Sequence, residues 1–137
     1  MYPLREHAQE GICTKSLYVA TYEGKIVGSV IYLLEQGQVY QNVNWQLDFD
    51  VPVIVIHILA VHPDYLGCGV GKAVLEYAEN FGRRQGARTI RLDTYEKNTP
   101  AVRLYEKCNF QECGRVDLGL EPIYGLKWYR AFEKIIN

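Results

Sequence analysis

The sequence lacks an apolar run long enough to cross a membrane, and it lacks an excess of charge of either sign. A membrane-spanning helix needs about 20 apolar residues, whereas the longest apolar run here, 51–61, is interrupted by Pro52 and His57. Fifteen Lys and Arg residues against 16 Asp and Glu residues give a formal charge of −1. Because non-specific binding to nucleic acid or an anionic membrane needs a clear basic excess, the composition predicts neither partner.

Repeats, low-complexity stretches, linkers and paired cysteine motifs are also missing from the sequence. The N-terminus has no basic segment followed by an apolar one, so no signal peptide is predicted. The cysteines at 13, 68, 108 and 113 follow no metal or redox spacing, so we expect reduced thiols in the cytoplasm and no bound metal. The length of 137 residues predicts a single domain over residues 1–137.

The first half of the chain has the pattern of a β-hairpin followed by a loop and a buried strand. Two β-rich runs, 16–22 and 25–34, flank a tight turn in which Gly24 supplies a positive φ. Residues 35–50 are polar and irregular, and a loop of that length in a compact domain is usually functional or mobile. The nearly continuous apolar run at 53–61 predicts a central strand covered on both faces.

The second half alternates helices and strands. Apolar residues recur at helical spacing from Val70 to Phe81, and a second apolar stripe follows Thr99 and Pro100, which are typical of a cap and a first helical position. Further strands are predicted at 89–94, 110–116 and 126–132. The resulting order ββ, β, α, β, α, β, β predicts an α/β fold with a mixed sheet and helical crossovers.

A glycine-rich loop precedes the predicted helix. Its sequence is Gly67-Cys68-Gly69-Val70-Gly71-Lys72. Glycines let the backbone approach a ligand closely, and N–H groups at a helix start favour an anion such as phosphate. The loop is not a Walker A sequence, because Leu66 and Ala73 stand where that motif has Gly and Ser or Thr. Taken alone, the glycines are also compatible with a tight turn that serves packing.

Three blocks, in this order and spacing, resemble the GNAT superfamily of N-acetyltransferases. They are Leu59-Ala60-Val61-His62-Pro63, the glycine-rich loop, and a segment with Asn98-Thr99-Pro100-Ala101, Leu104-Tyr105-Glu106-Lys107 and Phe110. The resemblance implies the acyl-CoA N-acyltransferase fold, with a mostly antiparallel sheet. It also implies acetyl-CoA as cosubstrate, no metal, and direct transfer of the acetyl group to a primary amine in a ternary complex. The amine would belong to a small molecule, a peptide or a protein.

The resemblance also implies roles for individual residues. Backbone groups of Leu59, Ala60 and Val61 would pair with the pantetheine arm, and their N–H groups are suited to stabilising an oxyanion. The N–H groups of Gly67, Cys68, Gly69, Val70, Gly71 and Lys72 would hold the pyrophosphate. Asn98 would hydrogen-bond the cofactor. Tyr105 would stand beside the thioester sulfur, where a phenol of pKa about 10 can protonate the departing thiolate.

The acceptor amine must lose a proton, and several groups are candidates for the base. Asp93, on the predicted strand at 89–94, is the first candidate; Glu96, His57 and a chain of water molecules are alternatives. Asp93 is equally compatible with an ion pair to a nearby arginine such as Arg91.

The acceptor site is predicted from parts of the chain with little motif content. We expect the 35–50 loop, the N-terminal segment and the closing strands to form it, with Trp45 and His57 among the substrate-binding residues. Asp48 and Tyr124 are further candidates for its walls.

Two departures from the family pattern bear on activity and assembly. Leu66 replaces the usual Gln or Arg, and only about 15 residues precede the hairpin, where the family has a strand and helices. The N-terminal strand and helix are therefore predicted to be absent. Because an uncovered sheet edge pairs readily with another chain, we predict a homodimer.

A catalytically weak or inactive CoA-binding module is the alternative function, and a nucleotide-binding regulator is a third candidate function.

Overall fold

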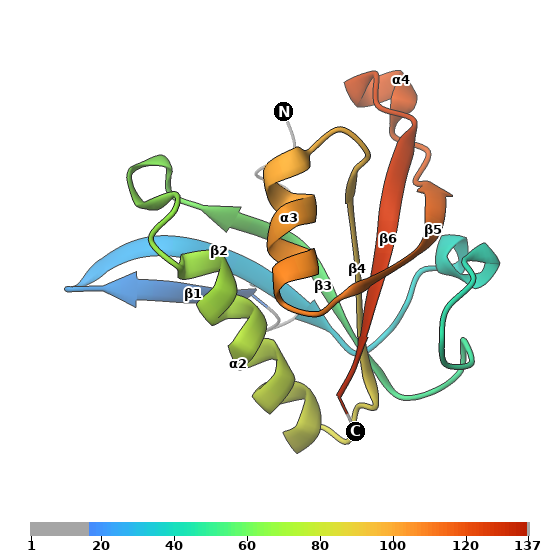
Figure 1. The fold of residues 1–137 in the computed structure, drawn as a ribbon, viewed down its shortest axis with the longest axis horizontal. Helices are drawn as coiled ribbons and strands as arrows, with labels where there is room; N and C mark the ends of the chain where they lie inside the picture. Colours follow the sequence, from blue (N-terminus) through green and yellow to red (C-terminus); the bar gives the residue numbers. More distant parts are fainter. Residues whose placement is uncertain (1–16, 137) are drawn as a thin grey trace.

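The structure, a computed structural model, describes residues 17–136 (Figure 1). Its strands are β1 (Leu17–Tyr22), β2 (Lys25–Leu33), β3 (Val53–Val61), β4 (Thr89–Tyr95), β5 (Gln111–Asp117) and β6 (Trp128–Ile135). The α-helices are α2 (Val70–Arg84), α3 (Thr99–Lys107) and α4 (Glu121–Tyr124), and the 3₁₀ helices are η1 (Gln38–Asn42) and η2 (Pro63–Tyr65). The predicted absence of an N-terminal strand and helix concerns residues that lie outside this range.

The strands form one sheet in the order β1-β2-β3-β4-β6-β5. Neighbouring strands are antiparallel except β3 and β4, which run parallel. The predicted fold class, a mixed and mostly antiparallel sheet with helical crossovers, is therefore confirmed. The hairpin turn is also as expected, because Glu23 and Gly24 both have positive φ, at 50° and 78°. Such a pair matches the twist of the strands it joins.

The two faces of the sheet are covered by different kinds of structure. Helices α2 and α3 pack on one face, where Ile54, Ile90 and Phe132 are fully buried (Figure 1). The 35–50 loop contributes Tyr40 to the buried cluster on the other face. The central strand β3 is thus covered on both sides over its first residues, as its apolar run predicted.

The buried side of α2 is rotated from the predicted stripe. Leu75 and Gly82 are buried, whereas Ala73 and Tyr77 are exposed. A Cβ atom on Gly82 would lie 2.7 Å from Cδ1 of Ile136, so glycine allows α2 to lie close to the sheet. None of the helices within residues 17–136 is long and apolar enough to cross a membrane.

A buried ion pair joins β4 to β6. The Arg91 Nε–H donates to Oε2 of Glu133 at 2.8 Å, and neither side chain is exposed. The remaining N–H groups of Arg91 donate to Oε1 of Gln36 and to the carbonyl oxygens of Leu47, Asp48 and Phe49, at 2.8–3.1 Å. The Glu133 carboxylate also accepts hydrogen bonds from the Gln46 N–H and the Thr89 hydroxyl. The loop is therefore held to the sheet by charge-assisted hydrogen bonds.

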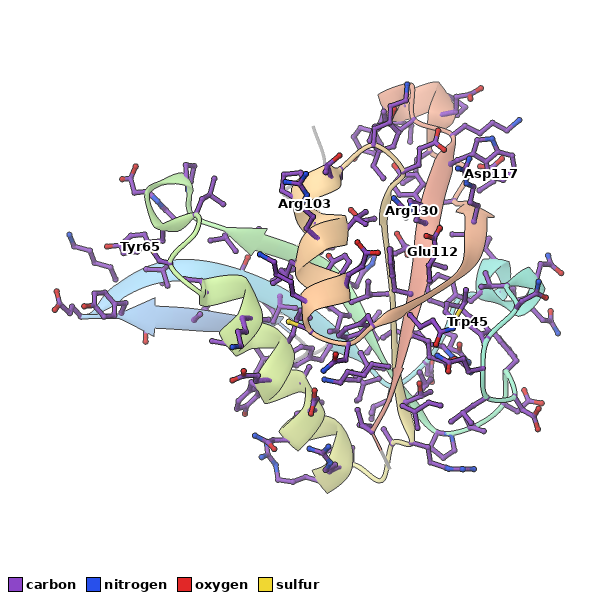
Figure 2. The ribbon with its side chains drawn as sticks, in the orientation of Figure 1. Trp45, Tyr65, Arg103, Glu112, Asp117 and Arg130 are labelled. Atoms are coloured by element: carbon purple, nitrogen blue, oxygen red, sulfur yellow. The ribbon has the colours of Figure 1, made fainter. Side chains whose placement is uncertain are left out.

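We predict that Arg91→Ala lowers the free energy of unfolding by about 3–5 kcal/mol, because it leaves the Glu133 carboxylate buried without its cation. Urea denaturation measures the change. Arg130→Ala is the control, since Arg130 pairs with Glu112 at 2.6 Å near the surface (Figure 2). Its loss should cost about 0–1 kcal/mol. Equal losses in the two variants would contradict the prediction.

Candidate active site at the opening between β3 and β4

The parallel pairing of β3 and β4 stops early. It joins Val53–Val55 to Thr89–Arg91, and beyond these residues the two strands diverge (Figure 1). From Ile56 onward, one edge of β3 pairs with no strand among residues 17–136, and the same holds for β4 from Leu92 onward. Backbone N–H and C=O groups need hydrogen-bond partners. An open strand edge therefore suits a ligand with an extended, amide-containing chain.

A β-bulge lies in the open part of β3. Ser29 pairs with Ala60 and Ile31 with His57, so one residue of β2 faces both Ile58 and Leu59. Ile58 has φ of +56°, a conformation that is strained for a β-branched side chain. Bulges redirect a strand and are frequent beside active sites. The bulge thus sets the course of Leu59, Ala60 and Val61, the segment predicted to pair with pantetheine.

The glycine-rich loop ends in a left-handed residue that starts α2. Gly69 is the N-cap, with φ 86° and ψ 8°. The first α-helical hydrogen bond runs from the Ala73 N–H to the Gly69 carbonyl at 3.0 Å. The N–H groups of Val70, Gly71 and Lys72 therefore have no acceptor within the helix. Together with the helix dipole they form a site suited to phosphate oxygens.

Two loop residues have additional packing constraints. The Cys68 N–H, a predicted phosphate donor, already donates to the Tyr65 carbonyl at 3.2 Å. A phosphate would have to compete with that carbonyl for this N–H group. A Cβ atom on Gly71 would lie 2.7 Å from Cδ2 of Leu104. Gly71 therefore allows the start of α2 to lie against α3, in addition to any role in ligand binding.

Asn98 rather than Thr99 caps α3. The Asn98 side-chain oxygen accepts the Ala101 N–H at 3.3 Å, and Pro100 is the second helical residue. The predicted cap was wrong because the sequence offers two adjacent capping residues, and both are among the residue types that favour this position. The Asn98 oxygen is engaged in the cap, which leaves its amide N–H groups as donors for the predicted cofactor contact.

Tyr105 lies on α3 and is buried against Phe110 and Phe132, with ring centroids 6.0 and 5.5 Å away. No described residue forms a hydrogen bond with its hydroxyl group. Burial raises the pKa of Tyr105, and the negative charge of Asp93 raises it further. The phenol therefore keeps its proton at neutral pH, and the tertiary structure places Tyr105 and Asp93 within electrostatic range of each other.

Asp93 lies on β4 with one hydrogen bond from the described residues, donated by the Tyr40 hydroxyl to Oδ2. It forms no ion pair with Arg91, because Arg91 is bound to Glu133. Burial raises the pKa of Asp93 to about 6, although the Tyr40 hydrogen bond acts in the opposite direction. Asp93 therefore changes charge just below neutral pH and is largely ionised at pH 7.

The other candidate bases lie at different places. The last pair in the parallel ladder of β3 and β4 is Val55 with Arg91. His57 lies two residues beyond Val55, and Asp93 lies two residues beyond Arg91. The Glu96 carboxylate accepts a hydrogen bond from Arg115 at 2.8 Å. Asp93 and His57 thus flank the start of the opening, whereas the Glu96 carboxylate is engaged by Arg115.

Trp45 has structural contacts in the 35–50 loop (Figure 2). Its indole N–H donates to the Tyr40 carbonyl at 2.7 Å, and the Arg91 guanidinium carbon lies 4.7 Å from the centroid of its ring. Trp45 thus helps to hold Tyr40 over Asp93, whereas contact with an acceptor stays a prediction.

Two tyrosines that were not among the predicted site residues, Tyr40 and Tyr129, lie near Asp93. Tyr40 is 53 residues from Asp93 along the chain. Tyr129 is 3% exposed, and its hydroxyl has no hydrogen-bond partner among the described residues. Both are members of a set of eleven tyrosines, and no local motif marks either one.

The profile of the Acetyltransferase (GNAT) family matches residues 2–110. The chain therefore belongs to the GNAT acetyltransferase family, which confirms the resemblance noted in its sequence.

Two curated relatives illustrate the similarity. Streptothricin acetyltransferase from Streptomyces lavendulae is 31% identical over 61 residues, which cover 44% of this chain and 32% of the relative. The [ribosomal protein bS18]-alanine N-acetyltransferase of Escherichia coli K12 is 37% identical over 54 residues, which cover 39% of this chain and 36% of the relative. The matched segments thus span about a third of the length of these relatives.

Solved structures share the fold. A GNAT family acetyltransferase from Streptococcus agalactiae 2603 has a TM-score of 0.80 and 22% identity, covering 99% of this chain and 74% of the other. A GNAT family acetyltransferase from Elizabethkingia anophelis, crystallised with acetyl-CoA bound, has a TM-score of 0.74 and 16% identity. That match covers 98% of this chain and 84% of the other.

The described cysteines, Cys68, Cys108 and Cys113, are free. Residues 17–136 contain no cluster of three or more His, Cys, Asp or Glu side chains that could hold a metal ion.

We predict that Asp93→Asn stabilises the folded protein at pH 7. The pKa of Asp93 is about 6 in the folded state, against an ordinary value of 3.8. Between pH 3.8 and pH 6 the folded state therefore binds more protons than the unfolded state. As a result, the folded protein loses stability as the pH rises through this range. A difference of about two pKa units corresponds to about 3 kcal/mol. The gain should be about 3 kcal/mol at pH 7 and should vanish below about pH 4, as measured by urea denaturation across pH.

The matched control for this experiment is Asp48→Asn, in the same loop-covered region but with an exposed side chain. It should change the free energy of unfolding by less than about 0.5 kcal/mol. A destabilising effect of Asp93→Asn at pH 7 would contradict the assigned burial cost.

Proposed function

We propose that this chain is an acetyl-CoA-dependent N-acetyltransferase that moves the acetyl group to a primary amine by direct attack in a ternary complex. The single observation that carries the proposal is the opening between β3 and β4. Asp93 lies on the part of β4 beyond the parallel pairing, and its charge raises the pKa of the Tyr105 hydroxyl. Helix α2 begins with N–H groups that have no acceptor within the helix. Relatives named as acetyltransferases support the same reaction class.

The arrangement suits the proposed roles of the backbone. The pantetheine amides would pair with the edge of β3 at Leu59–Val61, as an added strand does. The pyrophosphate would bind the N–H groups at the start of α2. When the amine attacks the thioester carbonyl, a nitrogen–carbon bond forms and the oxygen gains negative charge, which a backbone N–H of β3 would stabilise.

Tyr105 would act in the second half of the reaction. The carbon–sulfur bond breaks and the thiolate leaves, and the Tyr105 hydroxyl would donate a hydrogen bond to it. Because burial raises the pKa of Tyr105 above its ordinary value, the phenol is a weaker acid than a free tyrosine. The hydroxyl would therefore act by hydrogen-bonding the thiolate as the bond breaks, and solvent would return to Tyr105 any proton that it passes to sulfur.

Asp93 would attract the acceptor and receive its proton. An alkylammonium has a pKa of about 10.4 and must lose a proton before its nitrogen can attack. The Asp93 carboxylate has a pKa of about 6, higher than an exposed aspartate, which narrows the gap between donor and acceptor. The proton would pass to Asp93 and then to solvent.

Acetyl-CoA binding is the first test. We expect calorimetric titration to detect acetyl-CoA but neither ATP nor NAD. Gly69→Val should weaken binding by at least about tenfold, because a β-branched side chain cannot adopt φ of 86° without strain and the N–H groups of the first turn would be displaced. Gly37→Ala is the matched control, since Gly37 has negative φ and only Val39 lies near its Cβ position. Unchanged affinity in Gly69→Val would argue against this phosphate site.

Turnover separates an enzyme from a binding module. Tyr105→Phe should lower kcat for acetylation of an amine by about 10²-fold, the lower range for loss of acid catalysis, while leaving acetyl-CoA affinity unchanged. Tyr77→Phe is the control, because Tyr77 is an exposed tyrosine of α2. If acetyl-CoA binds but no amine in a broad panel is acetylated, the alternative of a CoA-binding module is favoured.

The outer edge of β1 supports a proposed homodimer. No strand among residues 17–136 pairs with that edge, and Val19 and Tyr22 on β1 are about half exposed. Edges of this kind pair with other chains. Size-exclusion chromatography with light scattering should give a mass of twice 15.8 kDa at micromolar concentration. A monomeric mass there would count against the dimer.

A further inference from the structure

The loop-covered face of the sheet places Asp93 and Tyr129 next to each other. Asp93 pairs with Ala131 and Tyr95 with Tyr129 in the antiparallel register of β4 and β6. Because side chains alternate along a strand, these four residues share one face, and Asp93 and Tyr129 are diagonal cross-strand neighbours. Ala131 lies opposite Asp93, and its methyl side chain cannot form a hydrogen bond with the carboxylate. Tyr40 lies over the same face.

The Tyr129 hydroxyl is a buried polar group without a partner. The residue is 3% exposed, and no described residue forms a hydrogen bond with the hydroxyl oxygen. A buried hydroxyl without a partner costs free energy, so native structures seldom keep one without a use. Its pKa is raised by burial first and then by the negative charge of Asp93, which agrees with the register in placing the two groups near each other.

Asp93 is a partly buried carboxylate without a cation. Among the described residues it accepts one hydrogen bond, at Oδ2 from Tyr40, and it forms no ion pair. Its other oxygen, Oδ1, therefore stays available. Burying a carboxylate without a counter-charge is costly, and a cationic ligand would remove that cost.

We propose that Asp93 and Tyr129 together bind the acceptor, and that the acceptor is a primary alkylamine which binds as its ammonium ion. This inference rests on the proposed acetyltransferase function and deepens it. The ammonium has three N–H donors, of which one meets Oδ1 of Asp93 and another the hydroxyl oxygen of Tyr129. The rings of Tyr95 and Tyr129, with centroids 6.2 Å apart, add an aromatic surface that attracts a cation.

The depth of the Tyr129 hydroxyl favours an unbranched alkylamine over the α-amino group of a peptide. An α-amino nitrogen is attached to a carbon that also carries a carbonyl group and a side chain. That branching keeps the nitrogen away from a hydroxyl buried this deeply, whereas a nitrogen on a methylene chain has no such obstacle.

Direct binding of amines tests the inference without requiring turnover. n-Butylamine and alaninamide are titrated by calorimetry at pH 7 into the protein, both with and without saturating CoA. Both amines are mainly cationic at this pH. We expect n-butylamine to bind at least about tenfold more tightly than alaninamide. Asp93→Asn should weaken its binding by about tenfold or more, the range for a hydrogen bond to a charged group.

Tyr129→Phe gives a second readout that a purely structural tyrosine would not. It should weaken n-butylamine binding by about five- to tenfold and leave CoA affinity unchanged. It should also raise the urea midpoint of the free protein, because the unpartnered hydroxyl is removed. Tyr77→Phe, on the exposed side of α2, should alter neither property. Unchanged n-butylamine binding in Tyr129→Phe, or equal binding of alaninamide, would overturn the inference.

The outcome also separates this inference from the proposed function. If n-butylamine binds as expected but the protein does not acetylate it with acetyl-CoA, the amine site stands and the proposed activity fails. If acetylation occurs with alaninamide and without dependence on Tyr129, the activity stands and the amine site fails.

Discussion

The candidate site depends on the buried Arg91–Glu133 ion pair. Arg91 is fully buried on β4, and its guanidinium group bonds to Glu133 on β6 and to the backbone of the 35–50 loop. The same group lies against Trp45, which in turn hydrogen-bonds the backbone of Tyr40. Because a buried charge holds all of its partners at fixed positions, this one interaction sets the loop against the sheet and Tyr40 against Asp93.

The same pairing leaves Asp93 without a cationic partner in the part of the chain that the structure describes. Arg91 is the adjacent charge on the same face of β4, but each of its N–H groups is engaged elsewhere. The carboxylate of Asp93 is consequently partly buried with a raised pKa, at the point where β3 and β4 separate. Residues with strongly perturbed pKa values that border a sheet opening are typical of functional sites, since their cost to folding must be compensated by use.

Several elements of the fold and site were predictable because their signals are local. The apolar run of β3, the turn at Gly24 and the amphipathic pattern of α2 depend on residues close together in sequence. Gly69 likewise starts α2 within a loop whose glycines mark it. The sequence predicted the wrong residue where two nearby residues suited the same position. Asn98 caps α3 in place of the predicted Thr99, and Leu75 is buried on α2 in place of the predicted Ala73.

The sequence by itself determined the order of the strands and of the two long helices, the GNAT family membership, and the positions of Tyr105 and the glycine-rich loop, but not the short helices η1, η2 and α4. Only the tertiary structure decided that Arg91 pairs with Glu133 and not with Asp93, and that Tyr40 binds Asp93. It also decided that the Tyr129 hydroxyl lies buried with no hydrogen-bond partner among residues 17–136. These contacts join residues separated by tens of positions, and strand register together with burial selects them. Neither register nor burial is encoded in any short segment of the chain.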